Sequence, residues 1–183
     1  MTTKIALTGQ MRSGKDTVGG YLMIRYKFQQ FALSEGITKV CNVAGLIHPD
    51  TFRKPRAILQ GVGQDLRKYD PEVWIKYTQR KIDARTMSGS GDNIVISDVR
   101  QENEVKAFRE RGYFLVRVNA DPDIRIMRML ERGETINYEE LYHETEQHVQ
   151  DFEVDYELNN NGTLPDLYEQ IEEMMGVLSG SLY

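Results

Sequence analysis

The stretch that decides the fold is Gly9-Gln10-Met11-Arg12-Ser13-Gly14-Lys15-Asp16-Thr17, which follows the short apolar run Lys4-Ile5-Ala6-Leu7-Thr8. A glycine, four further residues and then Gly-Lys is the spacing of a loop whose backbone N–H groups surround the phosphates of a nucleotide. A side chain at Gly9 or Gly14 would keep a phosphate away from the backbone. A helix predicted from Lys15 to about Tyr26 would point its positive dipole end at the same place. The stretch therefore predicts a phosphate-binding loop between a strand and a helix.

Lys15 is expected to carry its ammonium group to the β- and γ-phosphate oxygens of that nucleotide. The pattern departs from its common form at Asp16, where Ser or Thr is usual, and the hydroxyl comes one position later at Thr17. The alternative is an ordinary glycine-rich turn from a strand to a helix. Because strand, spacing, lysine and helix occur together, the phosphate-binding loop is the favoured interpretation.

The composition describes a single globular domain of the cytoplasm. Of its 183 residues, 40% are hydrophobic and 28% are charged, which is typical of a soluble protein. The sequence has no apolar run near the roughly 20 residues that a membrane helix needs. The net charge of −5 argues against a nucleic-acid surface. Cys41 and the three histidines have no zinc-ligand spacing. We therefore expect small-molecule partners, with no nucleic acid, no membrane and no transition metal.

Strand-length apolar segments alternate with helical patterns, which is typical of an α/β fold with a parallel sheet. Five strands are predicted, over 4–8, about 28–33, 94–97, 114–118 and 155–158. Helices are predicted over 15–26, 35–44 with Ser34 as N-cap, 55–68, 71–87 with Asp70 as N-cap, from Asn103 to before Gly112, from Asp121-Pro122 to about Arg132, 141–149 and 164–178. This order predicts a three-layer α/β/α sandwich, with ligands at the carboxyl ends of the strands.

Two residues at the end of one predicted strand are candidates for chemistry. Asp98 ends an apolar strand, where an acidic residue assists magnesium in many proteins with this type of loop. Two positions on, Arg100 could hold a phosphate with both guanidinium prongs. The alternative is an ion pair, between Asp98 and Arg100 or between Arg100 and Glu104, that holds the loop.

Three arginines share one face of the helix predicted after Asp121-Pro122, since Arg125, Arg128 and Arg132 lie three and four residues apart. Such a row is usually a solvated surface. Phosphoryl transfer needs cations over the transferring group, however, and arginines placed there accelerate it by about 10³ to 10⁵. The catalytic interpretation is favoured.

Arg12-Ser13-Gly14-Lys15-Asp16-Thr17 resembles the loop of phage-type deoxynucleoside monophosphate (dNMP) kinases, members of the P-loop nucleotide kinase superfamily. Further motifs agree in their order along the chain: Leu59-Gln60, Gly63-Gln64-Asp65-Leu66-Arg67, Asp70-Pro71-Glu72-Val73-Trp74, Asp98-Val99-Arg100, Asn103-Glu104, His143-Glu144-Thr145-Glu146 and Asn159-Asn160-Asn161-Gly162-Thr163-Leu164. The resemblance implies a five-stranded parallel sheet of order 2-3-1-4-5. It also implies Mg-ATP as phosphate donor and a helical lid within about 121–140.

The resemblance also implies roles for individual residues. ATP would contact Gly9, Arg12, Ser13, Gly14, Lys15, Asp16, Thr17, Asn161 and Gly162, the last two along the adenine. Magnesium would be held by Thr17 and Asp98, directly or through water. Catalysis would fall to Lys15, Asp98, Arg125 and Arg128. The acceptor would contact Glu35, Arg67, Asp70, Trp74 and Arg100, with its phosphate on the two arginines.

Several of these assignments have plain alternatives. A lone Trp74 on a helix is often a core residue, and the segment 159–162 could be a simple strand-to-helix turn. Glu35 stands where such kinases often have Asp. His143 and Glu146 receive no chemistry and are interpreted as part of a structural network.

The function that these patterns favour is direct in-line transfer of the γ-phosphate of ATP to a dNMP, without a covalent enzyme intermediate. A dephospho-CoA kinase or an adenylate- or cytidylate-type kinase would share the donor half, and a non-catalytic nucleotide-binding module is a further alternative. Base and sugar preference and a homodimer stay open. If the chain is phage-encoded, the compartment is the host cytoplasm.

Overall fold

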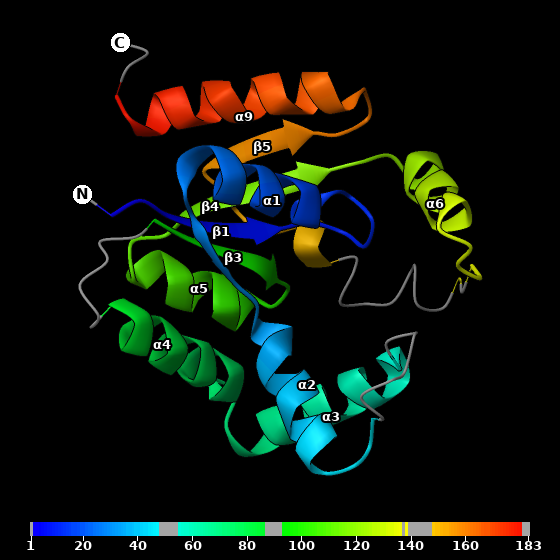
Figure 1. The fold of residues 1–183 in the computed structure, drawn as a ribbon. Coiled ribbons are helices and arrows are strands. Elements are labelled where there is room, and N and C mark those ends of the chain that lie inside the picture. The colour runs from blue at the N-terminus through cyan, green and yellow to red at the C-terminus, as the bar shows by residue number, and fades with distance from the viewer. Residues whose placement is uncertain (1, 48–54, 87–92, 137, 139–147, 181–183) are drawn as a thin grey trace.

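The sheet has five parallel strands in the predicted order β2-β3-β1-β4-β5 (Figure 1). The computed structural model describes residues 2–47, 55–86, 93–136, 138 and 148–180. The strands are β1 (Lys4–Thr8), β2 (Gln29–Phe31), β3 (Ile94–Val99), β4 (Phe114–Asn119) and β5 (Tyr156–Asn159). The predicted fold class and strand order are confirmed.

The described helices follow the predicted alternation of strands and helices. They are α1 (Lys15–Tyr26), α2 (Leu33–Val43), α3 (Arg56–Tyr69), α4 (Val73–Thr86), α5 (Glu102–Glu110), α6 (Pro122–Glu131), the 3₁₀ turn η1 (His148–Gln150) and α9 (Leu164–Leu178). Helices α1 and α9 cover one face of the sheet, and α5 lies on the other face (Figure 1). None of the described helices is both long and apolar enough to cross a membrane.

Two hydrophobic cores result from the alternation of side chains along the strands. In β1, Ile5 and Leu7 belong to the core under α1 and α9, whereas Ala6 belongs to the core shared with α2, α4 and α5. All three are fully buried, as expected for a central parallel strand.

The central position of β1 brings distant segments to the 9–17 loop. Thr8, the last residue of β1, is in register with Val99 of β3 on one side and Arg117 of β4 on the other. The 9–17 loop therefore leaves the sheet beside Asp98 and Arg100.

The start of α2 differs from the prediction that Ser34 is its N-cap. The helix begins two residues earlier, at Leu33, and its own cap residue, Ala32, has no side-chain acceptor for a hydrogen bond. The carboxylate of Asp98 does so instead: its two oxygens accept from Leu33 N at 2.7 Å and Ser34 N at 2.9 Å. The cap for α2 therefore comes from β3, and the sequence near α2 does not reveal it.

Smaller corrections concern other boundaries. Strand β2 is shorter than the predicted 28–33, and β3 continues past Ser97 through Asp98 to Val99. Helix α4 begins at Val73, because Asp70 caps a preceding turn by accepting from Glu72 N at 3.0 Å. Of the helix predicted over 141–149, residues 141–147 lie outside the described residues, and 148–149 belong to the 3₁₀ turn.

Replacing Asp98 with alanine is expected to lower the free energy of unfolding by about 1 to 2 kcal/mol, because the first N–H groups of α2 lose their acceptor. Urea denaturation measures this value. Ser34→Ala is the matched control and should change it by less than about 0.5 kcal/mol, the usual range for a substitution away from a cap or core. If the two variants lose the same stability, Asp98 is not the cap.

Candidate functional site

The 9–17 loop has a backbone that only glycine allows at two positions. Gly9 has φ +137° and Gly14 has φ +108°, both in the region that residues with a side chain rarely adopt. A Cβ atom on Gly9 would lie 2.4 Å from the carbonyl oxygen of Val118, and one on Gly14 would lie 2.1 Å from Nδ2 of Asn160. The spacing of the two glycines is therefore a requirement of this loop.

Lys15 lies inside the loop and is only 8% exposed. Its Nζ donates to the carbonyl oxygens of Gly9 at 2.6 Å and Gln10 at 2.8 Å. Burial lowers the pKa of Lys15 to about 7, and the positive charge of Arg100 adds to the effect. An anion placed here would relieve that unfavourable burial of positive charge.

Asn160, which follows β5, holds the loop from the opposite side. It is 4% exposed, and its Nδ2 donates to the carbonyl oxygen of Ser13 at 2.7 Å. The Ser13 hydroxyl is buried and has no hydrogen-bond partner among the described residues. The sequence analysis placed Asn160 in a motif but gave it no role. Its position at the carboxyl end of a strand was the available signal.

Both arginines of α6, Arg125 and Arg128, contact the 9–17 loop, and Arg132 follows the helix as its C-cap. Arg125 is 1% exposed, and its Nη1 donates to the carbonyl oxygen of Met11 at 3.4 Å. Arg128 donates to the carbonyl oxygens of Arg12 at 3.3 Å and Asn160 at 2.7 Å, and burial lowers its pKa. Arg132 is exposed at the end of the helix. The shared face predicted for α6 is therefore turned partly inward.

Arg67 of α3 and Arg100 after β3 meet at one carboxylate. Glu104 is 1% exposed. Its Oε1 accepts from Arg67 Nη2 at 2.8 Å, and its Oε2 accepts from Arg100 N at 2.9 Å. Burial raises the pKa of Glu104, against the attraction of Arg67, and burial also lowers the pKa of Arg100. Glu104 therefore joins the guanidinium of Arg67 to the backbone of Arg100.

A family model described as "AAA domain" matches residues 5–148, more than half of the chain. The chain belongs to this AAA domain family. The match contains the 9–17 loop, the arginines of α3 and α6, and Arg100 after β3. The comparison with curated proteins finds no match.

Solved structures with the fold of this AAA domain include proteins titled as kinases. TT1252 from Thermus thermophilus is 18% identical, with a TM-score of 0.62, and covers 100% of this chain and 98% of its own. A gluconokinase from Sinorhizobium meliloti 1021 is 16% identical, with a TM-score of 0.58 over 99% and 95%. A shikimate kinase from Acinetobacter baumannii is 14% identical, with a TM-score of 0.53 over 100% and 97%. At these identities the likeness establishes the fold alone.

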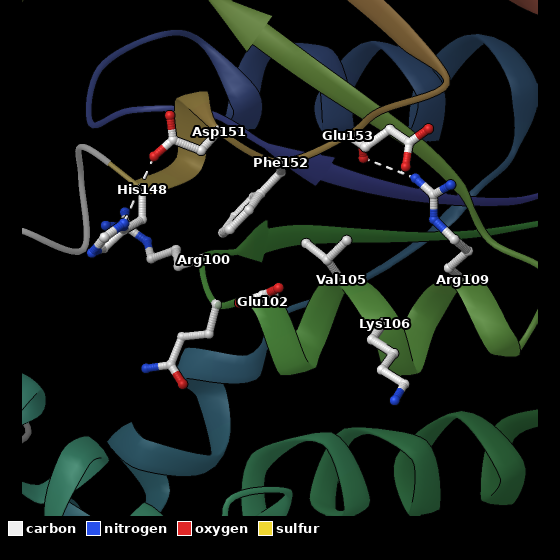
Figure 2. Close-up of a pocket in the computed structure, with 10 residues that line it drawn as sticks. Arg100, Glu102, Val105, Lys106, Arg109, His148, Asp151, Phe152 and Glu153 are labelled. Carbon is white, nitrogen blue, oxygen red and sulfur yellow. Dashed lines mark hydrogen bonds and ion pairs between the residues drawn. The ribbon is translucent and has the colours of Figure 1, made fainter.

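A cavity of about 650 Å³ begins at Arg100 and follows α5. Figure 2 shows Arg100 and His148 at one end, Val105 and Phe152 in the middle and Arg109 at the other end. The wall beyond η1 is held in place, since Arg109 Nη2 donates to the carbonyl oxygen of Glu153 at 2.8 Å.

The other residues predicted to contact the acceptor have partners in the protein. Glu35 pairs with Lys81, and Asp70 pairs with Lys76 at 2.9 Å. Trp74 is 2% exposed, and its indole N–H donates to the carbonyl oxygen of Gly63 at 3.0 Å. This burial favours the alternative that Trp74 is a core residue.

The turn assigned to adenine is tied to the start of α6, because Asn161 Oδ1 accepts from Asp121 N at 2.7 Å. A Cβ on Gly162 would lie 2.6 Å from Oδ2 of Asp166. His143 and Glu146 lie outside the described residues. Sequence reasoning missed Arg56 and Glu134, which contact the 9–17 loop and are described below.

Proposed function

We propose that the protein is an ATP-dependent kinase that moves the γ-phosphate of ATP to a phosphorylated small molecule, with a dNMP as the first candidate. The observation that carries this proposal is the burial of Lys15 within the 9–17 loop, where it is 8% exposed, its Nζ lies on two loop carbonyl oxygens, and Arg100 adds a second positive charge nearby. Cations held together in a low dielectric are a binding site for anions. Donor and acceptor phosphates supply that charge.

On the donor side, the backbone of the 9–17 loop and the first turn of α1 would surround the phosphates of ATP. Magnesium prefers oxygen donors, and the carboxylates of Asp16 and Asp98 near Lys15 are of this kind, although both Asp98 oxygens also accept from the first N–H groups of α2. Thr17 adds a hydroxyl in the first turn of α1. Mg²⁺ needs only one or two protein ligands besides phosphate and water. When bound, it would neutralise phosphate charge.

On the acceptor side, Arg67 and Arg100 would hold the phosphate. Glu104 would position the guanidinium of Arg67 and the backbone from which the Arg100 side chain starts. The cavity along α5 is available for the rest of the acceptor, because it begins at Arg100 and has Val105 and Phe152 on its walls. Such a cavity offers apolar contact to a planar base.

Helix α6 would serve as the lid, within about 121–140. Its arginines already contact the carbonyl oxygens of the 9–17 loop, so a small rearrangement would bring them to a phosphate. No protein base is needed, since the acceptor phosphate is ionised at neutral pH. Catalysis would then rest on positioning and on neutralising charge.

Binding of ATP at pH 8 is expected to take up a proton. With a pKa of about 7, Lys15 is mostly neutral at pH 8 in the free protein, whereas bound phosphates favour the ammonium form and raise this pKa. Calorimetric titration in buffers of different ionisation enthalpy measures the uptake. Lys15→Met should abolish the proton uptake. Lys68→Met, at an exposed position on α3, should retain it. Identical heats in all buffers for the unmodified protein would contradict the assignment.

A coupled assay of ADP release tests the function. The panel contains the dNMPs, AMP, CMP and dephospho-CoA, with gluconate and shikimate as acceptors that carry no phosphate. Turnover with a dNMP, and little with the others, supports the proposal. Preference for dephospho-CoA, AMP or CMP supports the alternative kinases. Tight ATP binding without transfer to any acceptor would instead indicate a nucleotide-binding module.

A further inference from the structure

Three segments of the chain meet at the carboxylate of Glu134, which lies just beyond the end of α6. Its oxygens accept from the guanidinium of Arg12 in the 9–17 loop, with Arg12 Nε at 3.2 Å from Oε2. Arg56, the first residue of α3, pairs with the same carboxylate at 3.5 Å. Two guanidinium groups from distant segments therefore converge on one internal anion.

Arg12 belongs to the 9–17 loop, and Arg56 reaches the loop from α3. Arg12 is three residues before Lys15, and its backbone has φ 63°. Nη1 of Arg56 lies 2.9 Å from the sulfur of Met11, so α3 reaches the loop at the residue next to Arg12. A phosphate chain seated on Lys15 would have its neighbouring groups within this region.

The electrostatics of the cluster favour the presence of an anion. Burial lowers the pKa of Arg12, and the positive charges of Arg132 and Arg56 lower it further. The side chains of Arg12, Arg56 and Glu134 are 20%, 32% and 25% exposed, so solvent only partly screens this repulsion. If Glu134 left, another anion would be favoured in its place.

We propose that Arg12 and Arg56 form a second anion site beside the 9–17 loop, and that Glu134 fills this site in the ligand-free protein as an internal substitute for a phosphate. A phosphate group offers more negative charge than a carboxylate and at least as many acceptor oxygens for guanidinium prongs. A bound polyphosphate displaces Glu134 and thereby releases the segment after α6 from α3. The inference rests on the proposed function only in that the 9–17 loop binds a polyphosphate.

Replacing Glu134 with glutamine tests the displacement, because the amide keeps the shape and loses the charge. Calorimetric titration with tripolyphosphate as the probe should give a dissociation constant about fivefold lower for Glu134→Gln than for the unmodified protein, the effect of removing a partly exposed ion pair. Glu131→Gln is the matched control. It removes the same charge from the end of α6 and should change the constant by less than about twofold. Thermal melting shows that each variant is folded.

A second pair of variants tells whether Glu134 competes with tripolyphosphate for the two arginines or only repels it through its negative charge. In an Arg56→Gln background, Glu134→Gln should tighten tripolyphosphate binding by less than about twofold, since one half of the anion site is missing. Equal or weaker binding by the single variant Glu134→Gln would overturn the inference, because Glu134 would then stay on its arginines in the complex. Turnover and acceptor play no part in this test. If the unmodified protein binds no tripolyphosphate, the donor site itself is wrong, and that failure is distinct from unchanged binding by the variant.

Discussion

Lys15→Ala should lower the rate of phosphate transfer by about a thousandfold or more while leaving the protein folded. Preorganised charge in a buried site is worth far more than the same charge in water, and the loss of one such group costs about 10² to 10³ in rate even when it is neutral. Lys15 is the buried cation at the centre of the loop, where its Nζ already lies 2.6 Å from the carbonyl oxygen of Gly9. No other described lysine lies inside the loop.

The fold should survive this substitution because burial disfavours the charged form of Lys15. Alanine removes that unfavourable term together with two hydrogen bonds to the loop. Circular dichroism and thermal melting check the fold, and the coupled assay checks the rate. Lys68→Ala, at an exposed position on α3, is the control and should keep full activity. Turnover of Lys15→Ala close to that of the unmodified protein would refute the role of this lysine.

The parts of the fold that sequence could predict are those set by local pattern. The bounds of β1, α1 and α9 match the predicted ones, because apolar periodicity, the glycines of the loop and Pro165 near the start of α9 are all local signals. The strand order followed from resemblance, and no local pattern contains it. The positions of Gly14 and Lys15 in the loop were likewise predictable, because the conformation of the loop backbone depends on the residues of the loop itself.

The parts that sequence could not predict depend on contacts between distant segments. Asp98 was assigned to magnesium, but its oxygens also cap α2 across 65 residues of sequence. Glu104 was considered as an ion-pair partner of Arg100, yet it pairs with Arg67, near the end of α3, because the fold brings that residue to the start of α5. Glu134 received no role from the sequence, since its partners Arg12 and Arg56 come from distant segments. Its role is evident only from these two arginine contacts in the folded protein.

The cations of α6 provide the sharpest distinction between binding and catalysis. In the free protein, Arg128 contacts backbone carbonyl oxygens of the 9–17 loop and of Asn160. These acceptors compete weakly with a phosphoryl group, because a carbonyl carries no net charge and an ionised acceptor makes a stronger hydrogen bond. Arg128 is therefore free to exchange its partners as negative charge spreads over the transferring group.

Arg128→Ala is expected to lower kcat by about a thousandfold, within the range for arginines that act on a transferring phosphoryl group, and to weaken ATP binding by only about threefold. The reason is that the 9–17 loop, with its amides and Lys15, would supply most of the ground-state contact, whereas Arg128 would act mainly in the transition state. Steady-state kinetics and calorimetric titration with ATP measure the two effects separately. Arg132→Ala is the matched control one turn further along, at an exposed position, and should keep most of the rate. If Arg128→Ala weakens ATP binding as much as it lowers turnover, or weakens binding alone, α6 belongs to the nucleotide site and is not a catalytic lid.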